Sequence, residues 1–501
     1  MPRLGRIAVG GAIAAGLVLR FVTRSQLWLD EALSVDIARL PIGDIPAALR
    51  HDGHPPLYYV LLHGWMQVFG EGDIAVRALS GVLAIAALPL AWLAGRRAGG
   101  RAAGWWMLGL FALSPFAVRY ATETRMYALV SLLVLGGYLL VRRALDEPRL
   151  SRLVPVAVVS GLLLLTHYWA LWFLAAVVVV LGWHGRRSPP FRTVAIAVLA
   201  GGIFLLPWLP SMLSQSAHTG TPWADPVRPT TMVTVSLSDL GGGDYAEAVL
   251  LGFALLALFV VGLAGRAIDD ERLELDVRGA PGVRLEAAVV GLTLIIATAA
   301  GYITHTTFAS RYIAVVMPLF LLVAAVGAAR LPGRMVPLAA LAGLLALGGI
   351  GSLHNVVTER TEAGVIADAV KAGAQPGDVV VICPDQLGPA LHRQLPASMT
   401  QLTYPSLGSP DLVDWRDYAK RNKAADPARF VDAVVSRASG APAVWLVASG
   451  SYKTLEGQCE SVGAALSGRL GAGQPVVAEN PDSYFEHASL TRFPGPAPAS
   501  P

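Results

Sequence analysis

Long apolar stretches separated by short polar segments run along the chain from residue 7 to residue 350. Each approaches the ~20 apolar residues that cross a hydrocarbon core of about 30 Å as a helix. The pattern therefore predicts a mostly α, polytopic membrane protein with about eleven transmembrane helices. The predicted spans are 7–22, 75–93, 104–118, 126–141, 153–165, 169–183, 194–208, 248–263, 287–302, 312–329 and 336–350.

Arginines between these spans predict the orientation. With a cytoplasmic N-terminus, every second loop lies inside, and these loops are the ones that are rich in arginine, such as 94–103, 142–152 and 184–193. Cytoplasmic loops of membrane proteins carry an excess of Lys and Arg. An odd number of spans then puts the C-terminal part outside a plasma membrane, so the arrangement is N-in/C-out.

Two outer loops belong to the predicted membrane domain, residues 1–352. The first, 24–73, contains helical stretches at 30–40, 43–50 and 56–69. The last of these is amphipathic and too short to span, so we expect it along the outer membrane surface. The second outer loop is 210–245. Its part from 215 to 245 contains Trp223, Asp225 and a GGGDY sequence, and is predicted to form a flexible cover over a site.

The polar remainder predicts a separate small α/β domain at residues 353–490. Strand-like runs at 378–383, 443–448 and 475–479, expected to be buried, alternate with helix-like stretches at 362–372, 428–439 and 455–470. The two cysteines, Cys383 and Cys459, both fall here. Outside the cell they can form a disulfide, and two buried free thiols are the alternative. Residues 491–501 are predicted to be a disordered tail.

Composition agrees with the span pattern and narrows the function classes. Hydrophobic residues make up 54% of the chain and charged residues 15%, against about 25% charged in soluble proteins. This balance excludes one large water-soluble enzyme. The net charge of +4 is small and dispersed, which gives no indication of a nucleic-acid partner.

The most informative polar motif is WLDEA at 28–32, just outside the first span. One interpretation is structural, with Asp30 near a helix N-terminus where the helix dipole favours a negative charge. The other is catalytic, because a partly desolvated carboxylate at the membrane boundary can act as a general base. Asp30 and its neighbour Glu31 are the candidate catalytic residues.

Other polar clusters lie on the same side of the membrane. In HDGHPPLYY, Asp52 and His54 precede two prolines that begin a helix. In RYATETRMY, ionisable groups interrupt apolar sequence between two spans, either as an internal Glu–Arg pair or as a phosphate site. The THYWA and HTTFASRY motifs add further candidates, with an aromatic belt and phospholipid headgroup binding as the competing interpretations. The candidate substrate-binding residues are Asp52, His54, Arg119, Tyr120, Glu123, Arg125, Tyr127, His167, Tyr168, Arg311 and Tyr312, with His305 beside the last two.

Taken in order, WLDEA, HPPLYYVLLHGWMQVFG, VRALS, RYATETRMY, THYWALW, PWLPSM and SRYIAVVMP resemble the GT-C lipid-dependent glycosyltransferases. The protein-mannosyltransferase and aminoarabinose-transferase group is the most similar, over residues 1–330. The resemblance implies an inverting transferase that moves a sugar from a polyprenyl-phosphate donor to a cell-envelope acceptor. It implies Asp30 as the base, and no cofactor or divalent metal. A metal site at His51, Asp52 and His54 is the alternative on the last point. A leaving phosphate needs positive charge, for which Arg125 and Arg311 are the candidates. His54, which matches the residue before the two prolines in many relatives, supports them.

The sequence leaves other functions open. A transporter or flippase of a lipid-linked saccharide would need polar groups near the middle of the membrane, whereas the ionisable residues here cluster at outer ends. A non-catalytic assembly factor is the third hypothesis. The resemblance favours a mannose or arabinose-like sugar. The acceptor can be a lipoglycan, a cell-wall polysaccharide, another lipid or a protein.

Overall fold

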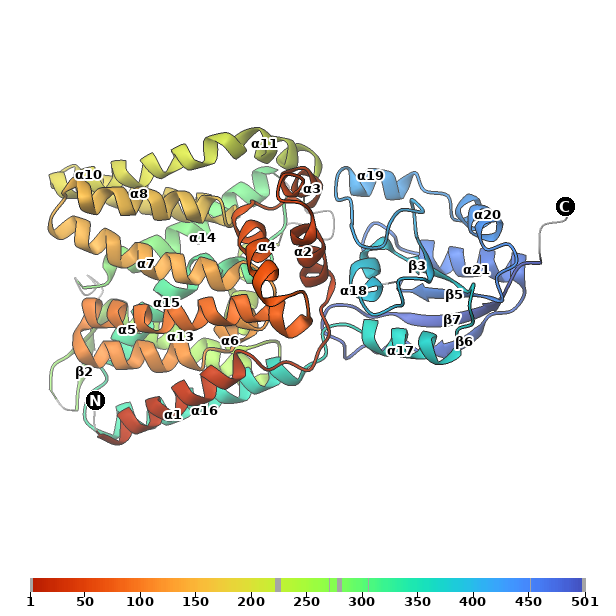
Figure 1. Cartoon of the computed structure of the whole chain (residues 1–501). Helices are drawn as coiled ribbons and strands as arrows, with labels where there is room; N and C mark the ends of the chain where they lie inside the picture. Colours follow the sequence, from red (N-terminus) through yellow and green to blue (C-terminus); the bar gives the residue numbers. More distant parts are fainter. Residues whose placement is uncertain are drawn as a thin grey trace.

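The computed structural model describes residues 3–220, 227–269, 271–276, 282–304, 306–450 and 452–497. A bundle of roughly parallel helices forms the N-terminal part, and an α/β domain lies against one end of it (Figure 1). The described chain begins at the opposite end of the bundle and ends on the far side of the α/β domain. Trp223, Asp225 and His305 lie outside the described residues.

All eleven predicted apolar stretches fall on helices. In chain order the bundle contains α1 (Arg3–Leu19), α5 (Asp73–Ala112), α6 (Pro115–Ala121), α7 (Tyr127–Asp146), α8 (Leu150–Leu164), α9 (Trp169–Gly185), α10 (Pro189–Ala200), η1 (Gly201–Trp208), α11 (Leu209–His218), α13 (Ala246–Ala264), α14 (Arg284–Thr304), η2 (Ser310–Val315), α15 (Met317–Ala328) and α16 (Met335–Val357). Six helices in the described part of the chain are long and apolar enough to cross a membrane, with α10, η1 and α11 counted as one. The predicted membrane protein is therefore confirmed.

Helix α5 holds two of the predicted spans because its backbone turns back on itself in the middle. Gly99 and Gly100 have non-helical angles, and Gly100 has a φ of 77°, a conformation that glycine adopts at little cost. The two arms then pack closely: a Cβ on Gly95 would lie 2.6 Å from the carbonyl oxygen of Ala103. The turn thus makes a helical hairpin out of one continuous element.

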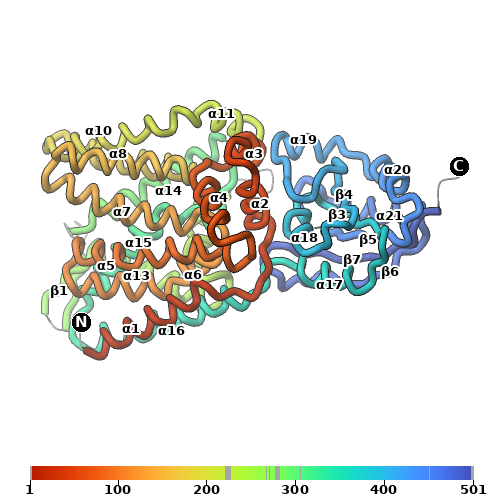
Figure 2. Tube along the Cα trace, in the orientation of Figure 1, coloured from red at the N-terminus to blue at the C-terminus, as the bar shows by residue number. Residues whose placement is uncertain are grey.

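Three short helices occupy the first outer loop, as predicted. They are α2 (Leu29–Arg39), α3 (Ile45–Asp52) and α4 (Leu57–Phe69), and they lie at the end of the bundle that faces the α/β domain (Figures 1 and 2). The second outer loop differs from the prediction, because its described part contains a helix, α12 (Pro229–Gly241). Proline at the first helical position and Gly242 with a φ of 115° begin and end this helix.

The α/β domain contains a five-stranded sheet in the order β4-β3-β5-β7-β6. Strands β3 (Val379–Cys383), β4 (Thr400–Thr403) and β5 (Ala443–Ala448) are parallel, while β7 (Ser489–Pro494) is antiparallel to β5 and to β6 (Gln474–Val477). Its helices are α17 (Ala363–Gly373), η3 (Asp385–Leu387), α18 (Gly388–His392), α19 (Tyr418–Lys423), α20 (Pro427–Arg437) and α21 (Gln458–Leu470). A small hairpin, β1 (Gly265–Ala267) with β2 (Leu273–Leu275), lies in the bundle part.

Two expectations for this domain were wrong. The disordered tail was predicted to begin too early, because residues 491–494 complete β7 between β5 and β6. Strand β5, the central partner of β7, lies more than forty residues earlier and gives no local signal. The run at 475–479 was expected to be buried, but β6 is a largely exposed edge strand. Native proteins keep edge strands short, and β6, with four residues, borders solvent at the rim of the sheet.

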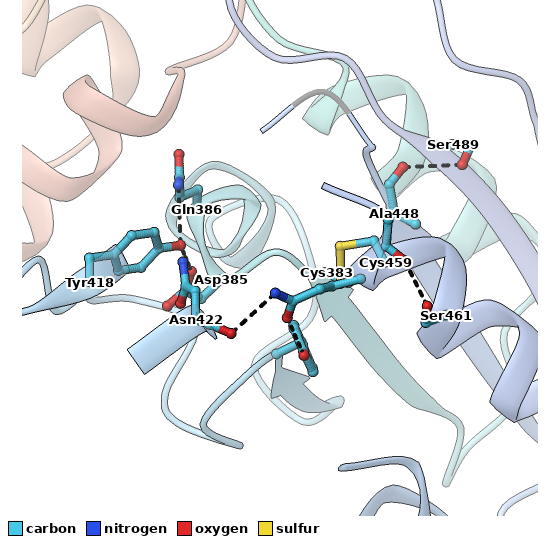
Figure 3. Close-up of a disulfide and its surroundings, with 12 residues drawn as sticks. Cys383, Asp385, Gln386, Tyr418, Asn422, Ala448, Cys459, Ser461 and Ser489 are labelled. Atoms are coloured by element: carbon cyan, nitrogen blue, oxygen red, sulfur yellow. Dashed lines mark hydrogen bonds between the residues drawn. A yellow bond between two sulfur atoms is a disulfide. The ribbon is translucent and has the colours of Figure 1, made fainter. Parts of the chain in front are cut away.

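A disulfide joins Cys383 at the end of β3 to Cys459 in α21 (Figure 3). Of the two alternatives for these cysteines, a disulfide or two free thiols, the structure contains the disulfide. Both cysteines are buried, and the bond links positions 76 residues apart. We expect the double variant Cys383→Ser/Cys459→Ser to lose about 2–5 kcal/mol of folding free energy, because the unfolded chain gains freedom. A lowered midpoint of thermal unfolding measures this loss. Two reactive thiols in denatured, unreduced wild-type protein would contradict the assignment.

Candidate active site

Asp30 lies in the first turn of α2, between two arginines from distant parts of the chain. Its Oδ2 atom is 3.5 Å from Arg311 Nη2 and 3.6 Å from Arg125 Nη2. Arg311 belongs to η2, and Arg125 to the connection between α6 and α7. The Asp30 side chain is 17% exposed, but its Oδ2 atom is buried and has no hydrogen-bond partner among the described residues. The structure therefore brings together the three side chains that the motifs predict.

A chain of polar contacts fixes the direction of Arg125. Its Nη2 donates to Nε2 of His54 (2.9 Å), whose Nδ1 contacts Oδ2 of Asp52 (2.7 Å). Since a guanidinium only donates, Nε2 must accept, and the proton of the imidazole lies on Nδ1. Burial alone would raise the pKa of Asp52, but His54, Arg125 and the Tyr59 hydroxyl lower it below its usual value. The aspartate is therefore ionised and holds His54 in one tautomer.

Arg125 is held in addition by α2 itself. Its Nη1 donates to the Ser34 hydroxyl (3.0 Å) and to the backbone oxygen of Asp30 (3.3 Å). The guanidinium is almost completely buried. The two terminal nitrogens of Arg125 thus contact the first outer loop at two places, Nη2 at His54 and Nη1 in α2. These contacts fix the position of Arg125 relative to Asp30.

Glu31, the second candidate carboxylate, has different surroundings. Arg77 donates to both of its oxygens (2.8 and 2.6 Å), and the backbone N–H of Thr124 donates to Oε1 (2.9 Å). The Glu31 side chain is fully buried. The carboxylate thereby ties α2 to α5 and to the connection that carries Arg125. Its two oxygens are occupied, in contrast to Oδ2 of its neighbour.

Three further predicted residues form a second cluster. Arg119 is 3.4 Å from Glu123 and 3.2 Å from Asp239, and the hydroxyl of Tyr120 is 3.5 Å from the other oxygen of Asp239. Burial raises the pKa of Glu123 and of Asp239, against the lowering effect of nearby arginines. Ser310, next to Arg311, lies beside Asp239 and also lowers its pKa. The second cluster therefore adjoins the first through η2.

Aromatic rings form one wall beside these clusters. The ring of His167 lies 5.6 Å from that of Tyr127 and 5.4 Å from that of Tyr312. Burial, with His54, Arg125 and Arg311 nearby, holds the pKa of His167 well below its usual range, so its imidazole is neutral. Its Nδ1 accepts the backbone N–H of Trp169 (3.1 Å).

Tyr168 lies apart from these rings. Its hydroxyl contacts the side-chain oxygen of Gln215 and accepts a hydrogen bond from Trp208. Gln215 in turn donates to the backbone oxygens of Leu49 and His54. Tyr168 therefore supports the loop that presents His54 and has no contact with Asp30.

Several residues of the site were not predicted. Asp239 lies in the loop that was expected to be a flexible cover, and Arg360 follows the last helix of the bundle and donates to Thr122 (3.0 and 2.8 Å). Tyr484, Phe485 and Glu486 come from the α/β domain. An acid within an otherwise uncharged helix is a usable signal for Asp239. No local signal marks the segment 484–486.

The predicted alternative metal site does not assemble. His51 contacts Asp414 of the α/β domain (2.9 Å), whereas His54 contacts Asp52. Across the described ranges, no group of three or more His, Cys, Asp or Glu side chains could hold a metal ion.

This arrangement has two chemical capacities. A carboxylate oxygen that accepts no hydrogen bond, such as Oδ2 of Asp30, can take a proton from a hydroxyl group placed beside it. Two buried or half-buried guanidinium groups beside it can hold an anionic oxygen, such as that of a phosphate, through charge-assisted hydrogen bonds.

Comparison with known proteins supports the predicted resemblance. Residues 53–213 match the family described as dolichyl-phosphate-mannose-protein mannosyltransferase. The structure is similar to that of ArnT from Cupriavidus metallidurans bound to undecaprenyl phosphate, with a TM-score of 0.62, 14% identity and coverage of 97% of each chain. The apo structure of that protein gives a TM-score of 0.64 at the same identity and coverage. Comparison with curated proteins finds no match. The chain thus has the GT-C fold of ArnT, and its segment 53–213 matches the protein-mannosyltransferase family, as its motifs predict.

Proposed function

We propose that this protein is a membrane glycosyltransferase that moves a sugar from a polyprenyl-phosphate donor to a hydroxyl group of an acceptor. The observation that carries the proposal is Oδ2 of Asp30, which accepts no hydrogen bond and lies between Arg125 and Arg311. The family match at residues 53–213 and the fold shared with ArnT, which has been solved with undecaprenyl phosphate, support it.

The proposed reaction is one displacement with inversion at the anomeric carbon. Oδ2 of Asp30 takes the proton from the acceptor hydroxyl while the hydroxyl oxygen attacks this carbon. The bond from the carbon to the phosphate oxygen breaks, and polyprenyl phosphate leaves with one more negative charge. Arg125 and Arg311 stabilise that charge, and His54 keeps Arg125 in place. The activated donor supplies the energy, so the reaction needs no nucleotide.

The remaining expectations belong to the same proposal. The arginine pattern supports a cytoplasmic N-terminus, with the active site and the α/β domain outside the cell. We propose that the transferase works without a divalent metal, because Arg125 and Arg311 supply the positive charge that a metal would otherwise provide. Mannose and arabinose-like donors are the first to test, with a glycan, a lipid or a protein as acceptor.

The direct test incubates purified protein with a panel of radiolabelled polyprenyl-phosphate sugars and cell-envelope acceptors. We expect one donor to label an acceptor fraction in a reaction that continues when EDTA is present. Absence of transfer from every donor, together with movement of the lipid-linked sugar across proteoliposomes, would instead establish a flippase. Loss of transfer in EDTA would refute the metal-independent reaction.

Arg125→Lys should weaken binding of undecaprenyl phosphate by about tenfold or more. A lysine is a point charge and cannot contact His54, Ser34 and a phosphate oxygen in the planar geometry of arginine. Quenching of tryptophan fluorescence during titration with the lipid measures the effect. Arg187→Lys, at an exposed arginine between α9 and α10, is the matched control. Equal affinity in the two variants would contradict the role of Arg125.

A further inference from the structure

The N-terminus of α2, which carries Asp30, is capped by the other end of the chain. The side chain of Trp28 at the N-cap position makes no capping hydrogen bond. The backbone N–H of Leu29, the first residue of the helix, donates instead to Oε1 of Glu486 (3.1 Å), 457 positions later. The first amides of a helix lack partners within the helix. A buried side chain from the α/β domain therefore fulfils the capping role.

The Glu486 side chain is buried, and its carboxyl group is mostly uncharged at neutral pH; both properties suit this contact. Its side chain is 2% exposed, and burial, reinforced by Asp30 and Glu31, raises the pKa of Glu486 to about 8. At neutral pH most of these carboxyl groups are protonated. The cap therefore adds little negative charge beside Asp30, and the group resembles a glutamine in charge and in shape.

Aromatic contacts strengthen the same junction. The Trp28 ring stacks on Phe485 with ring centroids 3.8 Å apart, and the guanidinium of Arg311 lies 5.8 Å from the Trp28 ring centre. Arg119 lies 4.3 Å from the ring centre of Tyr484 and donates to its hydroxyl (3.1 Å). Residues 484–486 thus contact Arg119 of the second cluster and the start of the helix that carries Asp30.

The backbone holds residues 484–486 against the chain that leaves the bundle. The amides of Tyr484, Phe485 and Glu486 donate to the backbone oxygens of Glu359 and Arg360 (2.9–3.1 Å). The side chain of Arg360 donates to Thr122 and lies 3.7 Å from Glu31. The position of Glu486 is therefore fixed relative to the bundle, which allows it to define where α2 begins.

We propose that Glu486 is a positioning residue of the transferase: by capping α2 from the α/β domain, it sets the place of Asp30 between Arg125 and Arg311. The proposal rests on the proposed function for its kinetic consequence. Its structural consequence, a helix end ordered from the other domain, is independent of the reaction.

The test compares the full-length variants Glu486→Ala and Glu486→Gln with wild type. Alanine removes the acceptor of the Leu29 amide, whereas glutamine keeps an oxygen there and matches the protonated carboxyl group. We expect kcat to fall about 10–100-fold in the alanine variant with little change in the donor KM, since a small misplacement of a catalytic group affects the reaction more than binding. The glutamine variant should stay within about threefold of wild type. Glu456→Ala, at an exposed position of the same domain, is the control for an ordinary loss of a glutamate.

Hydrogen–deuterium exchange of the peptide that covers residues 26–40 gives a measure without catalysis. Exchange in the first turn of α2 should become about tenfold faster or more in Glu486→Ala, because a buried hydrogen bond is lost, and should be restored in Glu486→Gln. If the alanine variant does not accumulate, Glu486→Asp, which withdraws the oxygen by one methylene, should show the same two changes.

Unchanged exchange, an unchanged kcat in an active enzyme, or a kcat that glutamine does not restore would each overturn the role of Glu486. A wild-type protein without transferase activity would refute the proposed function. In that case the exchange experiment still decides whether Glu486 caps α2.

Discussion

Asp30→Asn is expected to lower the rate of sugar transfer by about 10²–10⁴-fold, the usual contribution of a general base, while the protein still folds and inserts. An asparagine keeps the size of the side chain, but its amide cannot take a proton from the acceptor hydroxyl. The arginines on either side remain in place, so binding of the donor should change much less than kcat. Initial rates at saturating donor, measured on purified protein, give this comparison.

Asp44→Asn is the matched control, because Asp44 is an exposed aspartate of the same outer loop. Its rate should equal that of wild type, and both variants should elute as the wild-type protein does in size-exclusion chromatography. Turnover near wild type in Asp30→Asn would remove Asp30 as the base and leave the chemistry of the site without a proton acceptor.

Glu31→Ala is expected to lower the free energy of unfolding by about 3–5 kcal/mol, the effect of removing one partner from a buried ion pair. Arg77 and Glu31 form a bidentate pair with both side chains buried, and Arg360 lies 3.7 Å from the same carboxylate. Without Glu31, these two buried guanidinium groups lose a negative partner. Thermal unfolding in detergent, followed by intrinsic fluorescence, measures the change.

The exposed pair of Arg39 and Glu71 in the same region provides the comparison. Glu71→Ala should cost no more than about 1 kcal/mol, as is usual for ion pairs in water. The double variant Glu31→Ala/Arg77→Ala should lose less than the sum of its single variants, because neighbouring partners do not contribute independently. Equal midpoints for Glu31→Ala and Glu71→Ala would contradict the structural role of Glu31.

These two predictions show what the sequence could and could not reveal about the site. Asp30 and Glu31 are adjacent, and their shared motif marks both as candidates. Successive residues of a helix point about 100° apart, so their surroundings depend on what packs around α2. Arg77, which donates hydrogen bonds to both oxygens of Glu31, lies 46 positions later in an apolar helix. Only the folded chain distinguishes Asp30, whose Oδ2 accepts no hydrogen bond, from Glu31, whose two oxygens both accept one.

The same reasoning explains which other elements and site residues can be predicted from the sequence and which cannot. The apolar stretches and the three helices of the first outer loop are predictable because each depends on composition within one element. Arg125 and Arg311 are conspicuous because charges beside apolar sequence are costly. Strand β7 and Glu486 depend on partners far away in the chain, β5 and Leu29. Their sequence, SYFEHASLTRFP, resembles an ordinary polar loop.

The late position of β7 and Glu486 has a consequence for biosynthesis. Strand β7 fills the place between β5 and β6, and Glu486 reaches α2 only from this part of the chain. A ribosome that has translated the whole helical bundle has therefore made every candidate catalytic side chain, but the helix that carries Asp30 still lacks its cap. By the proposed role of Glu486, nascent protein in the membrane transfers sugar slowly until residue 486 has emerged, and a premature stop after residue 480 is expected to yield an inserted protein of low activity.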